Sequence, residues 1–256
     1  SKFQGLSSDE VLTVAPARGG GLWVGSDDGR IDRLLEGTAS GVPARELGGS
    51  RVLALLEDGE GRLWAGTDRG LSVRAGGEWT PFTQGLPRAA VRSLLQDRTG
   101  ALWVGTDGAG LVRLQKGAAT RFTTQEGLPS NQIRNLLEGG DGTLWVATYG
   151  GLAAYQDGRF RGYSRREGLS IDLVRSLHED KQGVVWVGTY GGGLNRLAQG
   201  RVLAITTREG LYSDVVYAIL EDDVGNLWMS GNRGVFSVSK RDVTALASGR
   251  IRAVRS

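Results

Sequence analysis

Residues 102–106 read Leu-Trp-Val-Gly-Thr, and this five-residue phrase returns along the whole chain. Close variants occupy residues 22–26, 63–67, 144–148, 185–189 and 227–231. The tryptophans at the second position are spaced by 41, 39, 42, 41 and 42 residues: Trp23, Trp64, Trp103, Trp145, Trp186 and Trp228. A fixed period of this length is the signature of a repeat architecture, so the repeat decides the fold.

Each repeat predicts four short strands separated by turns. In the fourth repeat, Asp157-Gly158 is a strong hairpin signal between two of the strands. The four strands are expected at residues 133–138, 144–148, 152–156 and 160–164. Four antiparallel strands in about 41 residues make the blade of a β-propeller. The sequence therefore predicts an all-β, six-bladed β-propeller as a single domain over residues 1–256.

The end of the chain is expected to complete the sixth blade. Residues 235–239 predict its third strand, and Arg250–Val254 is predicted to supply the fourth. Helical periodicity is expected only at residues 242–247. An open-ended solenoid is the competing architecture, but it would need polar capping units, and neither terminal repeat resembles one.

Composition excludes several classes of protein. The 256 residues include 42 Gly, no Cys and one His, so disulfides, thiolate chemistry and multi-histidine metal sites are excluded. The formal net charge of the chain is +3. The last 17 residues alone carry +4, so residues 1–239 carry −1. Nucleic-acid binding is therefore not expected. No run approaches 18 apolar residues, so no membrane span is expected, and no cofactor is expected.

The repeated phrase resembles the two-component regulator propeller repeat. The resemblance is clearest at residues 102–114, 127–137 and 185–197, and all six repeats carry it in part. It implies a periplasmic sensing region of a membrane-bound bacterial histidine kinase or diguanylate cyclase, whose ligand is an oligosaccharide in carbohydrate-responsive members. The further repeats, immunoglobulin-like domain, membrane span and output domain typical of such proteins are not found here, so a truncated or redesigned propeller is expected.

Candidate ligand-binding residues are sought where the blades differ. The residue after the first β-branched residue of each inner strand is Leu12, Leu53, Arg92, Arg134, Arg175 and Tyr217. The loops expected on the same face of the propeller, around its channel mouth, add Asn131, Asp172, Asp214, Tyr149 and Tyr190. Arginine forks suit carboxylates, and tyrosine offers a stacking face and a hydroxyl. This set predicts a site for a small polar ligand, such as an acidic oligosaccharide. Alternatively, the arginines pair with acids at the strand ends.

Other prominent residues are expected to be structural. The periodic tryptophans are expected in the core, and the Ser or Thr that follows them is expected to connect two strands. His178 replaces a leucine of the repeat in an inner strand, although His178-Glu179 superficially resembles a phosphoacceptor site. The acidic turns lack the spacing of a calcium loop, so no metal is expected.

Three functions are compatible with these residues. The leading prediction is a non-catalytic sensor or interaction module whose parent chain is anchored to a membrane. The first alternative is a scaffold without a ligand, including an engineered or truncated propeller. The second is a polysaccharide lyase, in which a tyrosine and an arginine would abstract a proton and stabilise charge.

Overall fold

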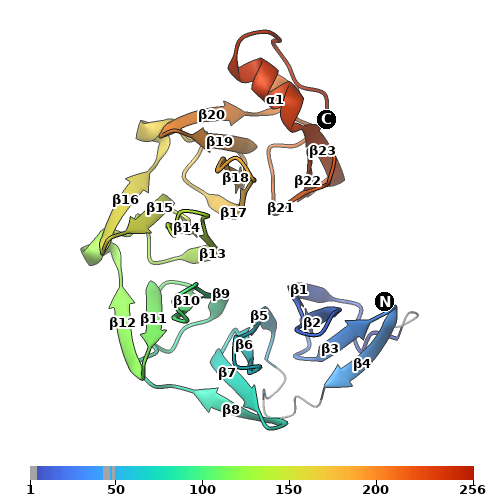
Figure 1. Cartoon of the computed structure of the whole chain (residues 1–256), viewed down its shortest axis with the longest axis vertical. Helices are drawn as coiled ribbons and strands as arrows, with labels where there is room; N and C mark the ends of the chain where they lie inside the picture. The colour runs from blue at the N-terminus through green and yellow to red at the C-terminus, as the bar shows by residue number, and fades with distance from the viewer. Residues whose placement is uncertain (1–4, 43–46, 48–49) are drawn as a thin grey trace. The chain divides into compact units, whose positions relative to one another are not determined.

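The computed structural model describes residues 5–42, 47 and 50–256. The chain forms two compact units, residues 1–123 and 124–256, and each contains three consecutive sheets (Figure 1). The prediction of a single domain over the whole chain stays a prediction.

In the first unit, each sheet has four antiparallel strands in chain order. The sheets comprise β1 (Val11–Pro16), β2 (Leu22–Ser26), β3 (Ile31–Leu35) and β4 (Thr38–Val42); β5 (Val52–Glu57), β6 (Leu63–Thr67), β7 (Gly70–Ala75) and β8 (Glu78–Phe82); and β9 (Val91–Gln96), β10 (Leu102–Thr106), β11 (Leu111–Gln115) and β12 (Ala118–Phe122).

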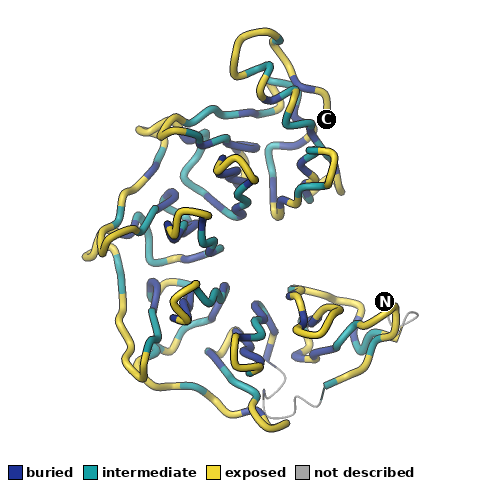
Figure 2. Tube along the Cα trace, in the orientation of Figure 1, coloured by how far each residue is buried: buried dark blue, intermediate teal, exposed yellow. Residues whose placement is uncertain are grey.

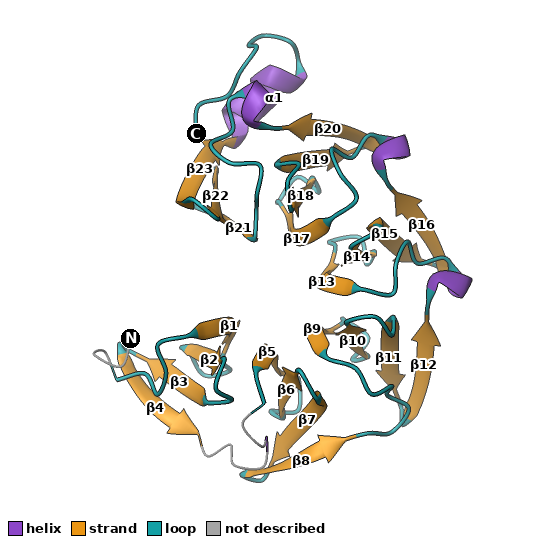
Figure 3. Cartoon of the chain, turned by 180° about the vertical axis from the view of Figure 1, so that it is seen from behind, coloured by secondary structure: helices purple, strands orange, loops and turns teal. Residues whose placement is uncertain are grey.

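The second unit repeats this plan and adds helices (Figure 3). Its sheets comprise β13 (Ile133–Glu138), β14 (Leu144–Thr148), β15 (Gly151–Gln156) and β16 (Arg159–Tyr163); β17 (Val174–Glu179), β18 (Val185–Thr189), β19 (Leu194–Ala198) and β20 (Arg201–Ile205); and β21 (Ala218–Glu221), β22 (Asn226–Gly231) and β23 (Gly234–Ser239). Its helices are the 3-10 turns η3 (Thr124–Glu126), η4 (Arg165–Glu167) and η5 (Thr207–Glu209), and α1 (Lys240–Ala247).

The six sheets are the blades of a six-bladed β-propeller, as predicted. Within the first unit, β1 contacts β5 and β5 contacts β9; within the second, β13 contacts β17 and β17 contacts β21. Within each unit, the first strand of a blade is thus packed against the first strand of the next. Buried residues follow the inner strands β5, β9, β13 and β17 and their partners, whereas β1, β21 and the outer strands are more exposed (Figure 2).

The end of the chain corrects one prediction. Arg250–Val254 is not a strand, because the N–H groups of Arg250 and Ile251 donate to the carbonyl of Ala245 near the end of α1. The sixth sheet therefore has three strands within the described part of the chain. Val254 nevertheless is buried and donates its N–H to the carbonyl of Glu209 at 2.7 Å. The tail thus contacts the preceding blade without joining the sheet.

The periodic tryptophans are largely core residues, as predicted. Trp64, Trp103 and Trp186 are 5%, 2% and 1% exposed. Their indole N–H groups donate to the aspartate six residues earlier, which is Asp58, Asp97 and Asp180 respectively. Trp145 is only half-buried and Trp228 is 45% exposed.

The threonines after the tryptophans connect the second and third strands of four blades, as predicted, but the prediction is wrong for Ser26 in the first blade, whose buried hydroxyl has no hydrogen-bond partner among the described residues. Thr106 donates its hydroxyl to the carbonyl of Gly110 at 2.6 Å, and Thr189 does the same to Gly193 at 2.9 Å. Each hydroxyl also accepts an N–H from the intervening loop. Since these hydroxyls are buried, the bonds fix the loop between the second and third strands.

Candidate ligand-binding surface

The residue after the first β-branched residue of each inner strand differs between blades, and in five blades it lies on a β-bulge. In β13, the pairing with β14 passes from Ile133 to Asn135, and in β17 the pairing with β18 passes from Val174 to Ser176. The inner strands of the first three blades have the same irregularity. The residues omitted from the pairing are Leu12, Leu53, Arg92, Arg134 and Arg175. A bulge bends the strand and redirects the extra side chain, so these residues leave the regular alternation of the sheet.

Backbone hydrogen bonds bring a loop residue to each bulge. The N–H of Asp107 donates to the carbonyl of Ala90, that of Tyr149 to Gln132, and that of Tyr190 to Leu173. Each acceptor is the residue immediately before the first residue of its inner strand. In these three blades, the residue after the repeated threonine is therefore held beside the bulge of its own blade.

In the third blade, this pairing neutralises the arginine. Arg92 donates from Nε to Oδ2 of Asp107 at 3.2 Å, and its Nη2 lies 3.1 Å from the same oxygen. Both side chains are partly buried. In this blade the arginine is paired with an acid at the strand end, which is the alternative to ligand binding that the sequence left open.

In the fourth and fifth blades, tyrosines replace the acid. Tyr149 and Tyr190 occupy the loop position that Asp107 has in the third blade. The guanidinium carbon of Arg134 lies 3.8 Å from the centre of the Tyr149 ring. Arg175 donates from Nη1 to the hydroxyl of Tyr149 at 3.0 Å, which connects the two blades. A guanidinium above an aromatic face is a favourable cation–π arrangement.

The array continues into the sixth blade. The guanidinium carbon of Arg175 lies 5.1 Å from the centre of the Tyr217 ring. Tyr217 packs against Tyr190, with ring centres 6.2 Å apart. Tyr190 is 48% exposed and Tyr217 is 37% exposed. We call the group Arg134, Tyr149, Arg175, Tyr190 and Tyr217 the Arg–Tyr surface. It lies wholly in the second unit.

Arg175 is the cation of this surface that can serve a ligand. Its side chain forms no ion pair with a carboxylate in the described part of the chain, and its recorded partners are the two tyrosines. Its side chain is partly buried, which weakens competition from water. Chemically, the arrangement can present guanidinium donors to an anion between aromatic faces.

The polar loop residues predicted beside this surface have structural partners. Asn131 accepts the N–H of Thr124 at 3.0 Å, Asp172 that of Arg165 at 2.8 Å, and Asp214 that of Thr207 at 2.7 Å. These three bonds begin the turns η3, η4 and η5, so the side chains shape the loops that precede the inner strands. Ligand contact by these residues stays a prediction.

The structure also contains an ionic cluster that sequence reasoning missed. His178 lies in the inner strand β17, as its position in the repeat predicted. It pairs with Trp186 in the sheet, and its Nε2 is 3.0 Å from Oε2 of Glu221. Lys240 Nζ lies 2.6 Å from Oε1 of Glu221 and 3.1 Å from Oδ2 of Asp180. Lys240 begins α1, outside the repeat, so the repeat pattern could not identify it as a partner.

A metal-binding cluster and a membrane-spanning helix are both absent from the described residues. No group of three or more His, Cys, Asp or Glu side chains there could hold a metal ion. None of the helices in the described ranges has the length and apolar character needed to cross a bilayer.

The geometry defines a β-propeller with a cationic, tyrosine-lined surface. Four stretches, residues 46–69, 85–108, 127–150 and 168–191, match the sequence profile described as "Two component regulator propeller". These four stretches therefore match the two-component regulator propeller repeat, which confirms the resemblance found in the sequence. A search of curated proteins finds no match.

Solved structures share the fold at low sequence identity. The extracellular domain of BT3049, assigned as a hybrid two-component system of B. thetaiotaomicron, has a TM-score of 0.68 and 18% identity over 96% of this chain and 40% of its own. A catalytically inactive virginiamycin B lyase from Staphylococcus aureus, solved with quinupristin, has a TM-score of 0.75 and 14% identity over 91% of this chain and 81% of its own. PorZ of Porphyromonas gingivalis has a TM-score of 0.69 and 16% identity over 93% of this chain and 40% of its own. The chain thus spans about two fifths of the length of the two-component domain.

Proposed function

We propose that this propeller is a non-catalytic sensor module whose Arg–Tyr surface binds an anionic ligand, with an acidic oligosaccharide as the first candidate. We place it in the periplasmic region of a membrane-anchored signalling protein. The similarity of its repeats to those of two-component regulators, and of its fold to extracellular domains of such systems, supports this setting.

One observation carries the proposal. Arg92 and Arg175 occupy corresponding bulge positions in the third and fifth blades, but Arg92 is bound by Asp107, whereas tyrosines contact Arg175. A partly buried guanidinium without an opposing carboxylate favours an incoming anion, because charge-assisted hydrogen bonds are roughly twice as strong as neutral ones. Tyr190 and Tyr217 add exposed aromatic faces on which an apolar ring face can stack.

The test is a thermal-shift screen of acidic and neutral oligosaccharides, with Arg175→Gln and Arg92→Gln as a matched pair. A ligand at 100 times its dissociation constant stabilises the folded state by about 2.7 kcal/mol. We expect acidic sugars to raise the unfolding midpoint of the native chain and of Arg92→Gln, and to have little effect on Arg175→Gln. No shift with any sugar, or equal shifts in both variants, would contradict the proposal and favour a scaffold without a ligand.

The lyase alternative makes a different prediction. It requires a base and a charge-stabilising group at one place, and the hydroxyl of Tyr149 with Arg175 is the pair that comes closest to this. The single histidine of the chain is instead bonded to Glu221. New double-bond absorbance during incubation with an acidic polysaccharide would support a lyase, and its absence would support a binding module.

A further inference from the structure

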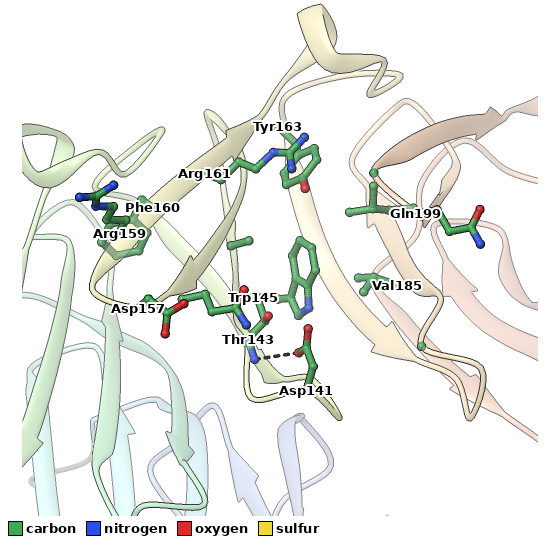
Figure 4. A pocket seen from close by; sticks show the side chains of 15 residues that line it. Asp141, Thr143, Trp145, Asp157, Arg159, Phe160, Arg161, Tyr163, Val185 and Gln199 are labelled. Carbon is green, nitrogen blue, oxygen red and sulfur yellow. Dashed lines mark hydrogen bonds between the residues drawn. The ribbon is translucent and has the colours of Figure 1, made fainter.

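A second candidate site lies away from the Arg–Tyr surface, in a groove between the fourth and fifth blades (Figure 4). The groove has a volume of about 830 Å³ and lies within the second unit. We call it the 4/5 groove. Its base is apolar and aromatic, with Tyr163, Val185 and Leu197 buried and Trp145 half-buried. Pockets of this size and character are typical of small-molecule sites.

Trp145 differs from the other periodic tryptophans in its hydrogen bonding. The other five indole N–H groups each donate to a carboxylate at 2.6–3.0 Å: Trp23 to Glu57, Trp64 to Asp58, Trp103 to Asp97, Trp186 to Asp180 and Trp228 to Asp222. For Trp145, no acceptor is found among the residues that the structure describes. The indole therefore lines the groove with an N–H available for a ligand.

A single change in the repeat explains this difference. The aspartate that precedes Trp64, Trp103, Trp186 and Trp228 by six residues is replaced by Gly139 in the fourth blade. Glu179 reaches this place from the fifth blade, but its Oε2 accepts the N–H of Gly140 at 2.9 Å. Oε2 of Glu57 accepts two N–H groups at the corresponding place in the first blade, but no hydrogen bond joins Glu179 to the indole of Trp145, and the half-buried indole keeps its N–H for another acceptor.

A second groove between blades, in the first unit, can be compared with the 4/5 groove. It lies between the second and third blades and has a volume of about 740 Å³. There the N–H of Trp64 is bound by Asp58 at 2.7 Å, and Arg62 covers the ring at 5.4 Å. A groove between blades is therefore a property of the repeat, whereas the available indole N–H is specific to the 4/5 groove.

The rim of the 4/5 groove indicates the charge of its ligand. Its ionisable side chains are Asp141, Asp157, Arg159 and Arg161, two acids and two bases, and all four residues are exposed. The rim therefore has no net charge, in contrast to the Arg–Tyr surface. A neutral ligand loses less hydration energy than an ion on entering an apolar base, so this balance favours an uncharged molecule.

We propose that the 4/5 groove binds a small uncharged molecule with a flat apolar ring, whose amide or ketone carbonyl accepts the indole N–H of Trp145. The ring would lie against Trp145 and Tyr163, whose ring centres are 5.9 Å apart, and the carbonyl would take the role that aspartate has in other blades. The proposal is independent of an anionic ligand at Arg175.

The test follows the indole N–H signals of the seven tryptophans by ¹H–¹⁵N NMR, with the signal of Trp145 assigned from Trp145→Phe. The probe is N-acetyl-L-phenylalaninamide, which is neutral, and N-acetyl-L-phenylalanine is its anionic counterpart. We expect the neutral probe to shift the Trp145 signal saturably while the Trp64 signal is unchanged. We expect the anionic probe to bind about tenfold more weakly.

Gly139→Asp is the decisive variant. Gly139 does not have a positive φ, and a Cβ there would meet Oε2 of Glu179 at 2.7 Å, the mobile end of a side chain. The new carboxylate should bind the Trp145 N–H and weaken the neutral probe about tenfold, with a lower unfolding midpoint because the carboxylates of Glu179 and Asp141 lie close by. Arg175→Gln should leave this binding intact. No shift at Trp145, an equal shift at Trp64, or unchanged binding in a folded Gly139→Asp would overturn the proposal.

Discussion

Oε2 of Glu57 accepts the indole N–H of Trp23 at 2.6 Å, across the boundary between the second blade and the first. The same oxygen accepts the N–H of Arg18 at 2.9 Å. The first blade has Ala17 where other blades have the aspartate that binds the tryptophan. A carboxylate from the next blade thus replaces a missing one, and the hydrogen bond that would lie within a blade connects two blades.

This relationship predicts the effect of removing the carboxylate. We expect Glu57→Ala to lower the free energy of unfolding by about 1–3 kcal/mol, because the partly buried indole N–H of Trp23 loses its acceptor. Glu57→Gln should cost less, since an amide oxygen can still accept. Ala17→Asp, added to Glu57→Ala, should recover part of the loss. Urea unfolding followed by tryptophan fluorescence measures all three, and a Glu57→Ala chain as stable as the native one would disprove the role.

The aspartates that bind indoles make the fold sensitive to acid. The backbone N–H of Asn226, with the N–H of Trp228 and the Asn226 side chain, lowers the pKa of Asp222 from its ordinary 3.8 to about 2. For Asp58, burial acts to raise the pKa but is outweighed by hydrogen bonds from Trp64 and Arg62, so the pKa is also lowered.

A pKa that is lower in the folded state means that the unfolded chain binds more protons in this range. The stabilisation is therefore complete above about pH 5 and is lost as the pH falls towards 2. We expect Asp222→Asn to be less stable than the native chain at pH 6 and to lose less stability between pH 5 and pH 2.5. Thermal unfolding across this range measures the effect, and parallel pH profiles would contradict it.

Lys240 stabilises the second unit through the ionic cluster. Burial acts to lower its pKa, but hydrogen bonds to Glu221 and Asp180 prevail and raise it, so the ammonium stays charged across the physiological range. Lys240→Met should destabilise the chain by about 1–3 kcal/mol, because the nearly buried carboxylate of Asp180 loses a charged partner. Arg241→Met, at the exposed neighbouring position, should change stability by less than about 0.5 kcal/mol. Equal effects of the two substitutions would rule out this role for the cluster.

The threonine after each tryptophan should be sensitive to an isosteric change. Thr189→Val keeps the shape but removes the hydroxyl that donates to Gly193 and accepts from Gly192. Since residue 189 is completely buried, we expect a loss of about 1–3 kcal/mol in the free energy of unfolding. Chemical unfolding tests this, and a neutral Thr189→Val would show that the hydroxyl is dispensable.

The repeat made most of the fold predictable from the sequence. Each tryptophan phrase is a local signal, and its recurrence gave the blades, their strands and the role of the threonines. His178 was assigned correctly to an inner strand because its position in the repeat is that of leucines in other blades. The tail was predicted wrongly: Arg250–Val254 alternates like a strand, but hydrogen bonds to the end of α1 hold its first residues.

The site was predictable only in part, because its geometry depends on contacts between blades. Comparison of the repeats identified Arg134 and Arg175, but the bulge beneath them has no glycine to mark it. The hydrogen bond from Arg175 to Tyr149 joins residues 26 apart in the sequence, and a single chain gives no local signal for such a pair. The replacement of aspartate by Gly139 was visible in the sequence, but its effect on Trp145 follows only from the structure.

The central claim is that the Arg–Tyr surface, and Arg175 in particular, binds an anion. The most direct measurement is a ¹H–¹⁵N titration of the arginine Nε–H signals with a uronic-acid disaccharide at low salt, where the screening of charge is weak. The account predicts a saturable shift of the Arg175 signal, while the signal of Arg92, held by Asp107, stays in place. An unmoved Arg175 signal at saturating disaccharide, or an equal movement of the Arg92 signal, would contradict it.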